Sequence, residues 1–313
     1  MRSKKIIVLT GSTGFVGSAI AAKVRCKELR LIGRCDPKIP NSIFCKATIC
    51  KSFNYLPFLQ NSNVVVHSAA RVHVMKDLAK DPLAEFRAVN VEGTLNLAKQ
   101  AAAAGVKRFI FLSSIKVLGE DTVLGKPFTN DDNLDPQDPY SVSKAEAEIG
   151  LREIGQNSGM DVVIIRPPLV YGVGVKGNFS SLLKLARLPI PLPLGAIVNK
   201  RSFVSIENLV DLVVKCLDHP NAKNKTFLVS DDSDLSTPEL LSMIAKGGGR
   251  KPCIFRCPIL LLSIFLHLLG KSAVYERLCG SMQVNIEDTK SKLSWKPPVT
   301  VEDAMVNCWV KTD

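Results

Sequence analysis

The stretch LTGSTGFVGSAI, residues 9–20, places three glycines directly after the apolar run KIIVLT. Glycines at this spacing, between a strand-like and a helix-like segment, allow a tight turn and a close approach of the backbone to a pyrophosphate. The start of the following helix also offers unpaired N–H groups to phosphate oxygens. The stretch therefore predicts a dinucleotide-binding turn at Gly11, Gly14 and Gly17, with Phe15 and Val16 at the start of the helix.

Strand-like and helix-like segments alternate through the first half of the chain. The expected strands are continuous apolar runs, as is typical of strands buried on both faces of a parallel sheet. They lie at KKIIVLT (4–10), ELRLIG (28–33), NVVVHSAA (63–70), KRFIFLSS (107–114) and DVVIIRPP (161–168). The expected helices between them cover residues 15–25, 82–105 and 140–156.

This alternation predicts an α/β fold, a Rossmann-type doubly wound parallel sheet. We expect residues 1–165 to form an NAD(P)-binding Rossmann domain. Segments rich in Pro and Gly follow, and residues 166–313 are expected to form mainly a smaller C-terminal substrate-binding lobe over the carboxyl edge of the sheet.

The composition is that of an ordinary globular protein, with 313 residues, 46% apolar and 22% charged. The chain starts with MRSKK and passes directly into a strand-like run, so we expect no secretory signal, a cytoplasmic location and reduced thiols at its nine cysteines. No second pair of ligands accompanies Cys253 and Cys257, so no metal site is expected. The net charge of +12 comes from scattered basic residues, which favours an anionic substrate over specific nucleic-acid binding.

The end of the second expected strand bears on the cofactor. An NAD site usually has an acidic residue there to bind the ribose hydroxyls, but this chain has Gly33 and Arg34. A guanidinium binds the extra phosphate of NADP, so we expect NADP or NAD, with NADP preferred. In the alternative interpretation, Arg34 is only a loop charge and Asp36 binds the ribose.

The segment PYSVSK places Tyr140 and Lys144 four residues apart at the start of an expected helix, so they share one face. An ammonium beside a phenol stabilises the phenolate and is expected to lower its pKa. The pair can then move a proton to or from a carbinol oxygen while a nicotinamide moves the hydride.

With these motifs, the chain resembles the extended short-chain dehydrogenase/reductase family, in the NAD-dependent epimerase/dehydratase branch that includes UDP-glucose 4-epimerase. The resemblance runs through TGSTGFVGSAI, VNVEGTLNLAKQA, FIFLSSIKVLGE, DPYSVSK, IIRPPLVYG and RSFVSIENLVD. It implies that Ser114 orients the reacting sugar oxygen, that Tyr140 is the acid–base residue and that Lys144 also holds the nicotinamide ribose. It further implies that Ala69, Ala70, Asn90 and Pro167 contact the cofactor. Asn178 and Arg201 would contact the diphosphate of the substrate.

Some of these assignments have alternatives. Ser113 could take the role of its neighbour, Asn90 could simply cap backbone groups, and Arg201 could be a surface charge. His67 ends a buried-looking strand and is expected to be structural, whereas the role of His73 stays open.

Departures from the family pattern bear on the reaction. Dehydratases of this kind have Asp-Glu after the Ser or Thr, whereas this chain has Ile115 and Lys116, which argues against dehydration. Val72 stands where the epimerase pattern has a Lys toward the cofactor, and with Arg34 it favours an exchangeable cofactor and hence a reductase. The pattern most resembles bacterial O-antigen C4 reductases that make UDP-N-acetylquinovosamine for lipopolysaccharide. The alternative is a UDP-glucose or UDP-N-acetylglucosamine 4-epimerase with tightly bound NAD.

Three other classes of function are weaker interpretations. A redox-sensing binding protein would not need the Tyr140 and Lys144 pair, a nucleic-acid binder would cluster its basic residues, and a steroid or phenolic-ketone reductase would not need Arg201. By analogy with the family we expect a homodimer. The apolar segment 258–270 is too short to span a bilayer, and we expect a helix buried between lobes or at a dimer contact, with a membrane-surface helix as the alternative.

Overall fold

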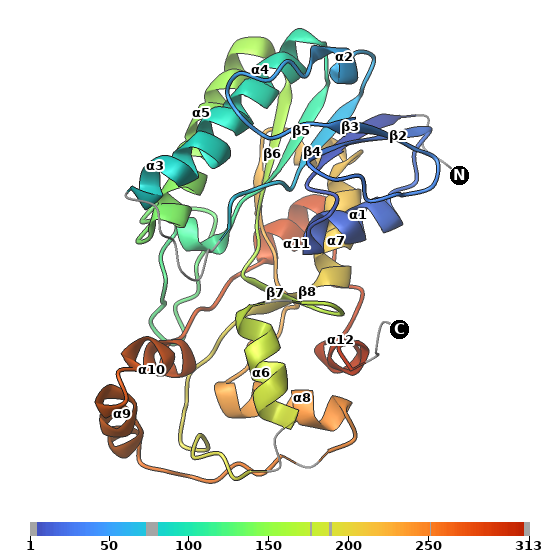
Figure 1. Cartoon of the computed structure of the whole chain (residues 1–313). Helices are drawn as coiled ribbons and strands as arrows, with labels where there is room; N and C mark the ends of the chain where they lie inside the picture. Colours follow the sequence, from blue (N-terminus) through green and yellow to red (C-terminus); the bar gives the residue numbers. More distant parts are fainter. Residues whose placement is uncertain (1–4, 73–80, 176, 188–189, 251, 310–313) are drawn as a thin grey trace.

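The computed structural model describes residues 5–72, 81–175, 177–187, 190–250 and 252–309. Its central feature is a seven-stranded sheet in which every neighbouring pair of strands is parallel (Figure 1). From one edge to the other, the strands are β3 (Ser42–Lys46), β2 (Glu28–Gly33), β1 (Ile6–Thr10), β4 (Val64–His67), β5 (Arg108–Leu112), β6 (Asp161–Arg166) and β9 (Thr226–Leu228). The predicted doubly wound Rossmann sheet is confirmed.

Helices cover both faces of the sheet because its strands send apolar side chains to both sides. Ile7 and Leu9 of β1 pack into one cluster, while Val8 between them packs into the other. The first face is covered by α1 (Phe15–Lys23) and α7 (Ile206–Cys216). On the second face lie α2 (Leu56–Leu59), α3 (Pro82–Arg87), a π-helical turn η1 (Ala88–Gly93), α4 (Thr94–Ala103) and α5 (Pro139–Ser158).

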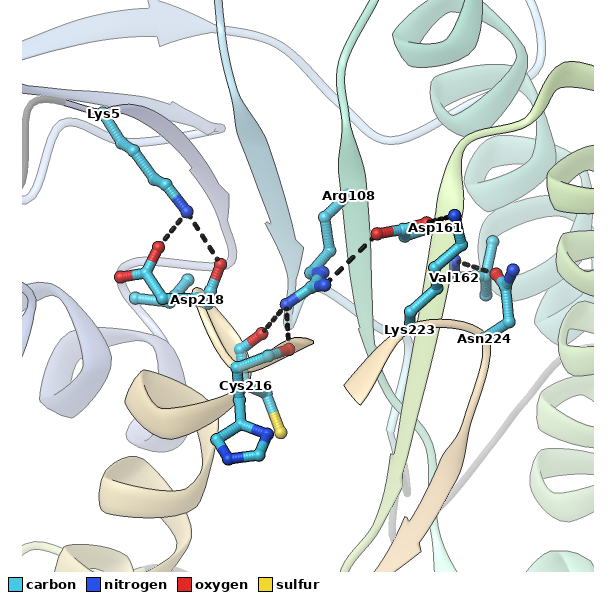
Figure 2. Close-up of polar contacts among 10 residues, drawn as sticks. Lys5, Arg108, Asp161, Val162, Cys216, Asp218, Lys223 and Asn224 are labelled. Carbon is cyan, nitrogen blue, oxygen red and sulfur yellow. Dashed lines mark hydrogen bonds and ion pairs between the residues drawn. The ribbon is translucent and has the colours of Figure 1, made fainter. Parts of the chain in front are cut away.

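Charged side chains form contacts at the amino edge of the sheet, where the strands begin (Figure 2). Arg108, 8% exposed at the start of β5, donates to the carbonyls of Cys216 and His219 at 2.7 and 3.0 Å and to Asp161 at 3.2 Å. Lys5, just before β1, pairs with Asp218. These contacts tie the end of α7 to the starts of the strands.

The smaller lobe continues directly from the carboxyl end of β6 (Figure 1). Its two-stranded parallel sheet pairs β7 (Leu169–Tyr171) with β8 (Phe203–Ser205). The helices of this lobe are α6 (Asn178–Arg187), α8 (Thr237–Gly247), α9 (Ile259–Leu268), α10 (Ser272–Cys279) and α12 (Val301–Asn307). The remaining short elements are the 3₁₀ turns η2 (Ile115–Val117) and η3 (Pro220–Ala222), and α11 (Glu287–Leu293) beside β9.

The second half of the chain contributes to both parts of the molecule. It supplies β9 to the large sheet and α7 to its face, so the sheet is not completed by residues 1–165 alone. All five strands expected from the sequence are present, while β3, β7, β8 and β9 were not expected. The helix expected over 82–105 is interrupted at residues 88–93 by the π-helical turn.

Candidate functional site

The turn after β1 requires glycine at two positions. Gly11 has φ +76°, and a Cβ there would lie 2.7 Å from the backbone nitrogen of Ala69. A Cβ on Gly17 would lie 2.1 Å from the carbonyl oxygen of Gly11, which is closer than real contacts allow. The N–H of Gly14 donates to that same carbonyl at 2.9 Å and closes the turn. The sequence thus folds here as predicted, with half-buried Phe15 and Val16 opening α1.

The same turn contains a buried polar group without a partner. The hydroxyl oxygen of Ser12, a residue 1% exposed, accepts and donates no hydrogen bond within the described part of the chain. Buried hydroxyls are normally satisfied, so an unpaired one between Gly11 and Gly14 fits a turn that receives phosphate oxygens. The residues present therefore suit a dinucleotide. Ser12 was not among the predicted site residues, although its place between two of the glycines was a usable signal.

The loop after β4 lies against the glycine turn. The N–H of Ala69 donates to the Thr10 hydroxyl at 3.2 Å, and Ala70 follows, half-buried. Asn90, in the π-helical turn, is 1% exposed; its amide accepts from the N–H of Arg71 at 2.8 Å and donates to the Arg71 carbonyl and the Ser143 hydroxyl, both at 3.0 Å. These bonds support the alternative that Asn90 caps backbone groups. It joins the β4 loop to α5, while a contact of Asn90 with the dinucleotide stays a prediction.

The two adjacent serines after β5 have different surroundings. Ser113 is 5% exposed and its hydroxyl donates to the Glu148 carboxylate at 2.6 Å. Ser114 is half-buried and caps η2, accepting from the N–H of Lys116 at 3.3 Å. Since the Ser113 hydroxyl is already committed to a buried carboxylate, the geometry favours Ser114 for the role of orienting a sugar oxygen.

The catalytic helix α5 begins at a strong amino-terminal cap. Asp138 accepts from the N–H of Ser141 at 2.6 Å, the Ser141 hydroxyl lies 3.0 Å from the N–H of Asp138, and Pro139 occupies the first helical position. Such a capping box fixes where the helix starts. It therefore fixes Tyr140 in the first turn and Lys144 one turn later.

The electrostatics of the pair differ from the sequence-based expectation. Burial, with the charge of Asp138 as a second cause, raises the pKa of Tyr140 to about 12. The prediction that Lys144 lowers this pKa is therefore wrong for the chain alone. Lys144 is 2% exposed, its ammonium lies 4.0 Å from the centre of the Phe111 ring, and burial lowers its own pKa to about 7 against the opposing effect of Glu148. A partly neutral lysine stabilises a neighbouring phenolate only weakly.

Behind this pair lies a buried ion pair that the sequence analysis missed. Arg166 donates to both carboxylate oxygens of Glu148, at 3.0 and 2.6 Å, and Arg152 reaches the same carboxylate at 3.2 Å. Glu148 and Arg166 are 1% and 3% exposed. The spacing of Lys144 and Glu148 on α5, four residues, was the signal available in the sequence.

The two positions at which dehydratases have Asp and Glu are Ile115 and Lys116 in this chain, and both side chains have structural contacts. Ile115 is 1% exposed in the core. Lys116 donates to Asp138 and to Glu120, each at 2.7 Å; burial opposes its charge, but these hydrogen bonds outweigh that effect and raise its pKa. Lys116 thus links the Ser114 turn to the cap of α5 and is not free to act as an acid or base.

At the end of β2, Arg34 and Asp36 differ in their local contacts. Asp36 accepts from the N–H of Lys38 at 2.8 Å, so its carboxylate stabilises the turn. Arg34 is exposed at the carboxyl end of β2. Asp36 is exposed as well, so both side chains can face a ligand.

The remaining predicted residues lie toward the small lobe. Pro167 follows β6, and its carbonyl accepts from the N–H of Ile115 at 2.9 Å. Arg201 is half-buried and donates to the carbonyls of Arg277 and Gly280 at 3.4 and 3.2 Å, and burial lowers its pKa, which Asp121 opposes. The alternative of a simple surface arginine does not fit this environment.

Two predicted positions have no described side chain. Asn178 opens α6, but its side chain lies outside the described part of the structure, and His73 falls outside the described residues altogether. His67, by contrast, is confirmed as structural: it is fully buried, its ring nitrogens lie 2.7 and 2.8 Å from the hydroxyls of Thr10 and Thr94, and burial lowers its pKa to about 3.

Comparison with known proteins identifies the family of the chain. Residues 7–230 match the model of the NAD dependent epimerase/dehydratase family. The chain belongs to this family. It is accordingly an enzyme of the NAD-dependent epimerase/dehydratase type, and the predicted membership of the branch is confirmed.

Individual relatives extend over nearly the whole chain. A protein of Vibrio cholerae named UDP-glucose 4-epimerase is 48% identical over 304 residues, covering 96% of this chain and 93% of that protein. The UDP-glucuronic acid 4-epimerase of Bacillus cereus, solved with NAD, is 20% identical with a TM-score of 0.76 and coverage of 96% of both chains. RMD of Pseudomonas aeruginosa, solved with NADPH, is 21% identical with a TM-score of 0.70 and coverage of 97% of both chains. The two structures support the shared fold.

Proposed function

We propose that this enzyme is a 4-epimerase of a UDP-linked hexose, glucose or N-acetylglucosamine, with tightly bound NAD. The observation that carries the proposal is the near-full-length similarity to the Vibrio cholerae protein named UDP-glucose 4-epimerase. We place it before the reductase, because a relative that carries a reductase name, the GDP-6-deoxy-D-mannose reductase of Pseudomonas aeruginosa, is only 25% identical to this chain.

The environments of the side chains support the following roles. Ser114 orients the C4 oxygen, and Tyr140 exchanges the proton of that oxygen. Because the raised pKa of Tyr140 keeps its phenol protonated near neutral pH, the residue can donate to a C4 ketone, a step that epimerisation and reduction share. Arg201 and Asn178 would hold the diphosphate. The dinucleotide, when bound, supplies hydride transfer at C4, and the turn from Gly11 to Gly17, Ala69, Ala70 and Lys144 would hold it.

A second candidate, the NADP-dependent C4 reductase that makes UDP-N-acetylquinovosamine, is favoured by one observation. Arg34 replaces the usual acidic residue at the end of β2, and Asp36 is engaged in its own turn. A reductase must release its oxidised cofactor at every turnover, so NADP preference and weak retention are expected of it. The predicted homodimer, the cytoplasmic location and the O-antigen role stay predictions.

The test is to denature the purified protein, identify any released nucleotide and then assay two substrates. A 4-epimerase releases stoichiometric NAD and converts UDP-glucose or UDP-N-acetylglucosamine to its C4 epimer without added cofactor. An empty protein that oxidises added NADPH only with a UDP-4-keto-6-deoxy sugar contradicts the epimerase and supports the second candidate. The variant Ser114→Ala, compared with Ser113→Ala, checks that either activity uses this site.

A further inference from the structure

The helix α9 exposes an apolar face to the outside of the small lobe. Its inner side packs through Leu262 and Leu266, 5% and 9% exposed, into a cluster with Leu192 and Leu241. The sequence-based expectation of a helix buried between the lobes is therefore wrong. On the opposite side lie large apolar side chains that are 49–81% exposed: Leu260, Leu261, Ile264, Phe265 and Leu268.

The spacing of these residues makes a single continuous stripe. Positions 260, 264 and 268 recur every four residues, and 261 and 265 lie beside them, so all five share one helical face. A helix that is apolar on all sides normally has every face covered, whereas here only one face is. Contiguous exposed apolar patches of this kind mark interaction sites.

The shape of α9 excludes a membrane-spanning role. Its ten residues extend about 15 Å, against a hydrocarbon core of about 30 Å. Within the part of the chain that the structure describes, no helix combines the length and the hydropathy needed to cross a bilayer. Figure 1 places α9 on the outer side of the small lobe, beside α10 and away from the large sheet.

The charge around α9 indicates which surface it meets. From residue 240 to residue 275 the sequence has five Lys or Arg and no Asp or Glu. Exposed cations flank the apolar stripe on both sides in sequence: Arg256 precedes the helix, and Lys271 follows it. Apolar side chains together with basic neighbours are the combination that binds anionic membrane interfaces.

We propose that α9 is a membrane-surface anchor that inserts its outer apolar face into an anionic phospholipid bilayer. A second copy of the chain is the competing occupant, but a two-fold contact would place the same basic segment of both copies at one interface. An anionic bilayer offers both the apolar layer for the stripe and the opposite charge for its neighbours. The proposal does not depend on which sugar the enzyme uses.

The anchor is connected to the candidate substrate site through one helix. The ring of His267 in α9 lies 6.1 Å from that of Tyr275 in α10. The guanidinium of Arg201 donates to the carbonyls of Arg277 and Gly280 at the end of α10. Docking of α9 would therefore hold the small lobe, with its predicted diphosphate-binding arginine, at the membrane surface.

The test is co-sedimentation of the full-length protein with vesicles of phosphatidylcholine alone or mixed with phosphatidylglycerol. We expect binding to the mixed vesicles that weakens with salt, and a loss of about tenfold in the triple variant Leu260→Gln/Phe265→Gln/Leu268→Gln. The matched control is Val123→Gln/Leu124→Gln, which removes two exposed apolar side chains elsewhere, 68% and 53% exposed, and should bind like wild type.

Three outcomes would overturn the proposal. The first is that the wild-type protein does not sediment with the anionic vesicles, and the second is that the triple variant binds as well as wild type. In the third, the triple variant changes from dimer to monomer in light scattering, which would assign the face to a second copy. Thermal unfolding of the triple variant, expected to match wild type because the three side chains are exposed, excludes a folding defect.

Discussion

The amino and carboxyl edges of the central sheet each bury a cation, but the surroundings of the two cations are opposite. Arg108 at the amino edge has a carboxylate and two carbonyls as partners (Figure 2). Lys144 at the carboxyl edge lies over the Phe111 ring, and among the described residues it forms no ion pair. A buried guanidinium whose donors are used leaves no uncompensated charge, whereas a buried ammonium without a carboxylate opposes folding. The buried cation at the amino edge is paired within the chain, whereas the buried cation at the carboxyl edge stays available to a ligand.

The largest expected effect is on catalysis at the carboxyl edge. Tyr140→Phe removes the hydroxyl that exchanges a proton with the sugar, so turnover should fall about a thousandfold while cofactor binding and the thermal midpoint stay near wild type. Initial rates and fluorescence titration measure these quantities. The control is Tyr55→Phe, which removes a phenol hydroxyl bonded to the Thr48 carbonyl and should keep turnover within about twofold. Turnover of Tyr140→Phe close to wild type would remove Tyr140 from the mechanism.

The next effect is on stability at the amino edge. Arg108→Met removes the buried donor of Asp161 and of two carbonyls, so the free energy of unfolding should fall by about 3 kcal/mol. The control is Lys223→Met, because Lys223 pairs with the same Asp161 at 3.3 Å but its side chain is 62% exposed; it should change stability by less than about 1 kcal/mol. Urea unfolding measures both. Equal losses would mean that the buried network does not fasten this edge.

A third prediction concerns the pH dependence of Lys144. Its pKa falls from 10.5 to about 7 on folding, so between these values the unfolded chain binds more protons and stability rises with pH. Below pH 7 the folded protein buries a charged ammonium, and Lys144→Met should therefore be more stable than wild type by about 2 kcal/mol at pH 6.

This gain should shrink as the pH rises toward 10, since wild type then buries a neutral amine. Urea unfolding of both proteins at pH 6, 8 and about 9.5 measures the difference. Arg108→Met serves as the contrast, because a guanidinium does not titrate in this range. A Lys144→Met effect that does not change with pH would show that this lysine is charged, or neutral, throughout.

The two edges also differ in how far the sequence reveals them. The long apolar runs predicted five strands, but β9, TFL, and β3, SIFCK, are too short or too exposed to stand out from loops. The spacing of Tyr140 and Lys144 predicted a shared helical face. It could not reveal the position of Lys144 over Phe111, because burial depends on how α5 packs on β5. The pairing of Ser113 with Glu148, which separates it from Ser114, likewise depends on tertiary packing.

The smallest expected effect concerns Arg34, at the carboxyl end of β2. It tests whether this cation is available to a ligand. Arg34 is exposed after β2 and, in the described structure, forms no ion pair, unlike Arg108. Arg34→Asp places a carboxylate where the extra phosphate of NADP would lie, so it should weaken NADPH at least about tenfold more than NADH. Asp36→Asn is the control, because Asp36 accepts a bond within its own turn and should affect both cofactors alike.

Calorimetric titration of both nucleotides measures this difference. Equal weakening of NADPH and NADH by Arg34→Asp would reduce Arg34 to a loop charge and remove the observation that favours the reductase. A selective loss of NADPH binding would mean that two cations at the carboxyl edge, Lys144 and Arg34, are held without carboxylate partners. At the amino edge the partner of the cation is part of the chain, and at the carboxyl edge it would be supplied by the ligand.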